Sequence, residues 1–176
     1  MLRHLCQAVS LVNNGESDIS RCATPQTQNA SLFVNPETDE VVAQGVDVSI
    51  RTSERPSERL RHAVMECIEN ASTTQTAKDS SPKTTRRTNS NSTKLYLCTG
   101  LDVYLKREPC VMCAMALVHS RVRRVVFAEC NRLQVGGLTC AQIHTERALN
   151  HRYEAFHLAL DKVETLMATT TSSVTK

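Results

Sequence analysis

One histidine and two cysteines in this 176-residue sequence have the residue types and the spacing of a zinc site. His62 lies in the segment RHAVME, and Cys110 and Cys113 lie in EPCVMC. Zinc binds cysteine sulfur and histidine nitrogen, and three protein ligands leave one tetrahedral position for water. Two cysteines three residues apart at a helix start face one side, where the helix N-terminus favours the thiolate. We therefore predict that His62, Cys110 and Cys113 bind Zn²⁺.

Other kinds of site fit parts of this pattern. A lone C-x-x-C segment before a helix can be a redox pair, but the preceding proline and the upstream His62 favour a metal. A zinc finger needs a second C-x-x-C segment, which this sequence lacks. An isolated histidine is by default an ordinary residue of a helix surface, but His62 accompanies the cysteine pair. The zinc prediction is therefore the one that uses all three residues.

The residue two positions after the histidine decides what such a site can catalyse. Zinc enzymes that deaminate nucleobases have a glutamate there, which is not a ligand and acts as the general acid and base. This sequence has Val64 at that position. Acid–base groups typically contribute about 10²–10⁴ in rate, so a valine predicts negligible turnover. The alternative is an active zinc-dependent cytidine or adenosine deaminase in which Glu66 supplies the acid, from a position about one helical turn, or about 5.4 Å, beyond His62.

The elements that must position these residues follow from the spacing of apolar side chains. Leu60, Ala63, Val64 and Cys67 recur at helical spacing around His62, and Pro109 can open a helix that carries both cysteines. Residues 143–167 are predicted to be helical or mixed. The predicted helices span residues 3–13, 57–70 and 109–120. A hairpin is predicted over 31–45, and strands are predicted over 102–108 and 124–129.

Strand, helix and strand over residues 102–129 form a βαβ unit and hence a parallel pair. Together with the hairpin, this unit predicts an α/β fold, a three-layer α/β/α sandwich with a mixed sheet. Residues 71–93 are rich in serine and threonine without large apolar residues, so we predict a disordered insert. The predicted organisation is an N-terminal helix and loop over 1–30, a zinc-binding domain over 31–165 and a disordered tail over 166–176.

Composition restricts the class of protein. No run approaches the 18 apolar residues of a membrane span, and the N-terminal apolar run is too short for a signal peptide. We therefore expect no membrane association and a reducing compartment, the nucleus or the cytoplasm, where the eight cysteines bind metal or pack. The formal charge of +3 is compatible with an RNA partner. Arg121, Arg123 and Arg124 are candidate RNA-binding residues, and a plain RNA-binding module is a further alternative.

Several segments resemble a known family. RHAVMECI, REPCVMCAMALVHSRVRRVVFA, GGLT and IHTERALNHRYEAF are similar to the noncatalytic subunits of eukaryotic tRNA wobble-adenosine deaminases, within the cytidine/deoxycytidylate deaminase superfamily. The resemblance covers residues 31–70 and 94–158. It implies a cytidine-deaminase-like fold with zinc on His62, Cys110 and Cys113. It also implies a heterodimer in which a partner carries an intact His-Ala-Glu and the complex converts adenosine 34 of tRNA to inosine.

Overall fold

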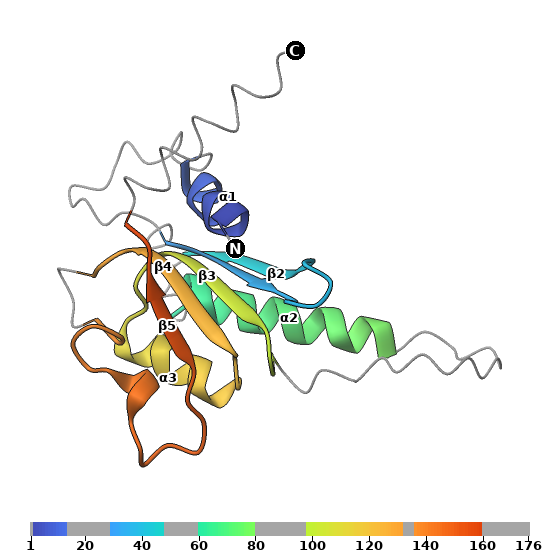
Figure 1. Ribbon diagram of the computed structural model, residues 1–176. Coiled ribbons are helices and arrows are strands. Elements are labelled where there is room, and N and C mark those ends of the chain that lie inside the picture. Colours follow the sequence, from blue (N-terminus) through green and yellow to red (C-terminus); the bar gives the residue numbers. More distant parts are fainter. Residues whose placement is uncertain (1, 14–28, 48–59, 80–97, 132–135, 160–176) are drawn as a thin grey trace.

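One mixed β-sheet with helices on both faces carries the candidate residues (Figure 1). The computed structural model describes residues 2–13, 29–47, 60–79, 98–131 and 136–159. In these residues, five strands lie in the order β2-β1-β3-β4-β5. They are β1 (Ala30–Val34), β2 (Val41–Val46), β3 (Asp102–Arg107), β4 (Arg124–Glu129) and β5 (Glu154–His157). The helices are α1 (Leu2–Asn13), α2 (Ala63–Asp79) and α3 (Val111–His119), with a short 3₁₀ helix over Ile143–Thr145.

The strand pairings confirm the two predicted units of the sheet. β1 and β2 form the antiparallel hairpin, and β3 and β4 form the parallel pair joined by α3. β1 also pairs antiparallel with β3, where Val34 lies opposite Asp102, so residues far apart in the sequence become direct neighbours. β5 adds in parallel to the edge of β4. The sheet is therefore mixed, as expected.

Alternate residues of the central strands face two different apolar layers. Leu105 of β3 packs in the cluster that contains α2 and α3, whereas its neighbour Tyr104 packs in the cluster that contains α1. This alternation places α1 on one face of the sheet and the other two helices on the opposite face, and it confirms the three-layer α/β/α sandwich. The predicted N-terminal helix is thus part of the same packed unit as the sheet.

Helix α2 differs from the prediction at both ends. It begins at Ala63 instead of residue 57, and it continues to Asp79, so residues 71–79 are helical and the prediction of disorder there is wrong. Ala71 is buried in the core, and the hydroxyls of Ser72 and Thr73 bond carbonyls of the preceding turn. No glycine or proline interrupts this stretch. A polar segment can therefore extend a helix that is already anchored, and residues 80–93 lie outside the described part.

The C-terminal part agrees with the prediction of a helical or mixed segment as far as residue 159, and it is mixed. Its regular elements in the described residues are the 3₁₀ helix and the strand β5. The open edge of β4 explains why β5 forms. The Glu154 N–H donates to the Arg123 carbonyl oxygen, and the Leu158 N–H donates to the Phe127 carbonyl oxygen. The predicted tail over 166–176 lies outside the described residues. None of the described helices is long and apolar enough to cross a membrane.

Candidate metal centre

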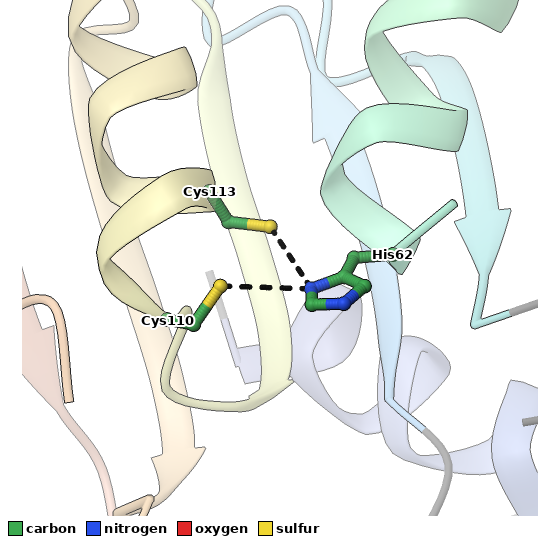
Figure 2. A group of neighbouring side chains, drawn as sticks. All are labelled: His62, Cys110 and Cys113. Carbon is green, nitrogen blue, oxygen red and sulfur yellow. Dashed lines mark hydrogen bonds between the residues drawn. The ribbon is translucent and has the colours of Figure 1, made fainter. Parts of the chain in front are cut away.

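The three predicted ligands converge in space (Figure 2). His62 lies directly before α2, Cys110 is the N-cap residue of α3, and Cys113 lies in the first turn of that helix. The Nδ1 atom of His62 lies 3.5 Å from each of the two sulfurs. The ligand atoms all lie within 4.8 Å of one another, although the chain separates His62 from Cys110 by 48 residues. Two sulfurs and one imidazole nitrogen form a donor set that suits zinc.

The start of α2, and with it His62, is fixed by the end of β2. The Ala63 N–H, which has no partner within its own helix, donates to the Asp47 carboxylate at 3.2 Å. Gly45 allows this close approach, because a Cβ there would lie 2.5 Å from the Ala63 carbonyl oxygen. Sequence analysis did not identify Asp47 as a site residue. The sequence signal that could have identified Asp47 is a carboxylate residue directly after the second strand of the predicted hairpin.

The two cysteines differ in how readily they lose a proton. A hydrogen bond from the Cys113 thiol, with a further contribution from His62, lowers the pKa of Cys110 to about 4. The hydrogen bond that Cys113 donates to Cys110, together with burial, raises the pKa of Cys113. The hydrogen bond between His62 and Cys110 raises the pKa of His62. The group therefore already favours one thiolate. A divalent cation bound here would displace the proton that remains on Cys113, since metal ligands bind in the deprotonated form.

Val64 contributes no proton-transfer group to this centre. Its side chain is only 1% exposed and packs in the apolar cluster that contains Phe33 and Cys67. Burial raises the pKa of the Cys67 thiol to about 12, and this thiol donates to the Ser31 carbonyl, as expected of a core cysteine. A buried aliphatic side chain thus occupies the position at which zinc deaminases have their glutamate.

The proposed substitute, Glu66, is held by another side chain. Two N–H groups of Arg61 bond its carboxylate oxygens at 2.5 and 3.0 Å. Among the described residues, the group of side chains with metal-ligand spacing consists of His62, Cys110 and Cys113, without Glu66. Arg61 thus binds both oxygens of the Glu66 carboxylate, and this ion pair does not favour the use of Glu66 as a catalytic acid.

The three predicted RNA-binding arginines lie at the other end of the central strands. Arg123 bonds both oxygens of the buried Asp102 at 2.8 Å, and Arg124 forms an ion pair with it at 2.9 Å. Arg121 is exposed and has a positive φ of 57° at the turn after α3. Because β3 begins at Asp102 and the two cysteine ligands follow its other end, the structure does not bring these arginines to the metal centre.

Comparisons with known proteins point to one family. Residues 8–129 match the family described as the cytidine and deoxycytidylate deaminase zinc-binding region. The chain is 36% identical over 166 residues to the "probable inactive tRNA-specific adenosine deaminase-like protein 3" of Danio rerio, covering 89% of this chain and 46% of that protein. It is 35% identical over 127 residues to the "tRNA-specific adenosine deaminase subunit tad3" of Schizosaccharomyces pombe, covering 72% of this chain and 37% of that protein.

Solved structures agree on the fold. A structure from studies of A-to-I editing by tRNA:A34 deaminases has a TM-score of 0.55 and 20% identity, and the match covers 89% of this chain and 96% of that one. A deaminase/reductase from Thermotoga maritima has a TM-score of 0.57 and 17% identity, covering 94% of this chain and 40% of that one. The chain spans less than half the length of the two curated relatives described above.

Proposed function

The chain belongs to the family of cytidine and deoxycytidylate deaminase zinc-binding regions, and from this premise we propose that it is a noncatalytic, zinc-binding subunit of a tRNA-specific adenosine deaminase. On this proposal it pairs with a second deaminase subunit that carries the intact His-Ala-Glu. The heterodimer then converts adenosine 34, at the wobble position of tRNA, to inosine. The relatives from Danio rerio and Schizosaccharomyces pombe, one of which is described as probably inactive, support this assignment.

The observation that carries the proposal is the contrast between an intact ligand group and a missing acid. His62, Cys110 and Cys113 keep the spacing that zinc requires, whereas Val64 is buried with no proton to transfer. We infer that the ligand group serves the fold and the assembly instead of the reaction.

Zinc held by these three residues would link the start of α2 to the start of α3. A structural zinc site contributes folding free energy directly, because the unfolded chain does not hold its ligands in place. His62 would bind through Nδ1, since that atom faces the two sulfurs. Chelation should therefore lower the melting temperature of the chain even though no reaction takes place at the site.

RNA would bind to a surface away from this metal. Arg121, Arg123 and Arg124 are the candidate phosphate contacts, and the Asp102 carboxylate fixes two of them. The position of these arginines at the start of β4 fits a subunit that extends the RNA surface of its partner. We place the complex in the nucleus or the cytoplasm.

The test is inosine formation on a tRNA with a wobble adenosine. The assay uses this chain alone, the catalytic subunit alone and the two co-purified. We expect activity only in the mixture, and we expect Cys113→Ser in this chain to reduce the yield of the active complex. Turnover by this chain alone at an ordinary enzymatic rate would refute the proposal. Glu66→Gln then decides whether Glu66 is the acid, since only the alternative predicts that this substitution abolishes activity.

A further inference from the structure

A buried carboxylate that the proposed function does not use lies next to the metal centre. The side chain of Glu108 is fully enclosed, in a residue only 1% exposed. Its oxygens accept hydrogen bonds from the backbone N–H groups of Asn131 at 3.1 Å, Leu138 at 3.0 Å and Thr139 at 2.6 Å. The Thr139 hydroxyl donates to the same carboxylate at 2.9 Å. All four donors are uncharged and three of them are backbone groups, so this carboxylate fixes the path of a loop.

That loop lies directly on the segment that carries the first cysteine. Gly136 forms an isolated β-bridge with Cys110, and the Gly137 N–H donates to the Pro109 carbonyl at 2.9 Å. A Cβ at Gly137 would lie 2.6 Å from the Cβ of Ala114 and 2.9 Å from the Cys110 carbonyl oxygen. At Gly136, a Cβ would collide with the Glu108 carboxylate. Gly137 is needed because its backbone packs on Pro109 and Cys110, and Gly136 is needed because its backbone packs on the Glu108 carboxylate.

Cys110 depends on this support more than Cys113 does. Cys113 is buried and lies inside α3, so the helix and the core fix its sulfur. Cys110 precedes the helix with an extended backbone, φ −68° and ψ 170°, and its side chain makes no cap hydrogen bond. The backbone of Cys110 is held on one side by the first helical bond, from Ala114, and on the other by the bridge to Gly136.

We propose that Glu108 is a positioning residue for the metal centre, which acts by holding residues 136–139, the GGLT loop, against Cys110. The inference rests on the proposed zinc site and adds to it a residue that touches no metal. In Glu108→Gln one of the two acceptor oxygens becomes an NH2 donor, so at least one of the three backbone N–H groups loses its acceptor and the loop is held less firmly against Cys110. The expected result is weaker and less ordered metal binding in a chain that still folds.

Asp102 provides a matched control at the other end of the same strand. Both residues are buried carboxylates, Asp102 as the first residue of β3 and Glu108 directly after its last, and each is held by several hydrogen bonds. Asp102 is bound by arginine side chains at the end of the central strands away from the metal ligands. Neutralising Asp102 should therefore lower stability without affecting the metal, whereas neutralising Glu108 should affect both.

The experiment compares wild type, Glu108→Gln, Asp102→Asn and Thr139→Val in the full chain. Zinc affinity is measured by competition with a chromogenic chelator, Co²⁺ loading reports ligand geometry through its visible spectrum, and thermal melting reports stability. We expect Glu108→Gln to weaken zinc binding about 10- to 100-fold, the usual effect of losing a group that orients a ligand, and to change the Co²⁺ spectrum. Thr139→Val, which removes one hydrogen bond, should weaken it roughly two- to tenfold.

The outcomes separate this inference from the proposed function. Asp102→Asn should keep wild-type zinc affinity and the wild-type Co²⁺ spectrum despite a lower melting temperature. Unchanged affinity and spectrum in Glu108→Gln would overturn the positioning role, and so would an equal loss of affinity in Asp102→Asn. If Glu108→Gln does not fold, Thr139→Val becomes the test of the positioning role. Unchanged zinc affinity in that mild variant would overturn the inference. A wild-type chain that binds no zinc would refute the proposed metal centre as well.

Discussion

Replacing Val64 with glutamate tests whether the site lacks only the catalytic acid or also lacks the space to hold one. The valine is enclosed by the core cluster, so a glutamate would bring two additional heavy atoms into a packed region. Overpacking of this kind typically costs about 1–3 kcal/mol. The carboxylate also gains no net counter-charge from the centre, because two thiolates neutralise a divalent cation. Val64→Glu should therefore destabilise the chain and leave it inactive.

The part of this destabilisation that comes from the charge of the glutamate can be measured separately by changing the pH. A shift of about three units in the pKa of a fully buried carboxyl, from about 4.3 upward, corresponds to roughly 4 kcal/mol. Because the folded-state pKa is raised, the folded chain holds the proton more tightly, and stability falls as pH rises between the two pKa values. The neutral variant Val64→Gln has nearly the same size and no such titration. The stability gap between the two variants should therefore widen by roughly 2 kcal/mol from pH 5.5 to pH 8.

The assay is urea denaturation of both variants at the two pH values, together with inosine formation by Val64→Glu alone. A gap that does not change with pH would show that the position is open to water, which contradicts the burial described above. Deamination by Val64→Glu alone would show that the rest of a catalytic site is intact. Either result would refute the reasoning that a closed core has replaced the acid.

Three further substitutions test the packing around the site by urea denaturation. Asp102→Ala should cost about 1.5–3 kcal/mol, since it removes charge-assisted hydrogen bonds but leaves Arg123 45% exposed, and no loss would show that water replaces these bonds fully. Gly45→Ala should cost about 1–3 kcal/mol, since its Cβ would lie 2.5 Å from the Ala63 carbonyl oxygen, and wild-type stability would contradict this close approach. Tyr153→Phe should cost about 1 kcal/mol through its bond to the Ala114 carbonyl, and a neutral effect would argue against that bond.

The sequence predicted those features that depend on local patterns. Pro109 and the two cysteines marked a helix start, and flanking apolar runs marked the parallel strands around it. The apolar spacing around His62 marked the second helix, whereas the meeting of its start with the start of α3 depends on how the two helices pack on the sheet. Val64 could be assigned because its position is defined relative to His62. The signals for the fold and for the ligand group were therefore short-range.

The remaining features depend on contacts between distant residues. Glu108 is buried because Asn131 and residues 136–139 pack on it, and the Asp102 pairs exist because the β3–β4 register puts Arg124 opposite Asp102. The helical residues 71–79 follow an anchored turn, and their own composition does not predict that anchor. β5 forms on an edge whose position is set by the whole sheet. No local pattern contains this information.

The antiparallel pairing of β1 with β3 has a consequence for the rate of folding. Val34 and Asp102 are adjacent in the sheet but far apart along the chain, so a long loop must close before β3 can join the hairpin. If zinc binds His62 and Cys110 before the sheet forms, the path between Val34 and Asp102 shortens from 68 residues to about 36, the 28 from Val34 to His62 plus the 8 from Asp102 to Cys110. Halving a loop lowers its closure cost by about 0.6 kcal/mol, which is roughly threefold in rate if that closure limits folding. A chain that refolds with zinc already bound should reach its native sheet sooner than one that acquires the metal last.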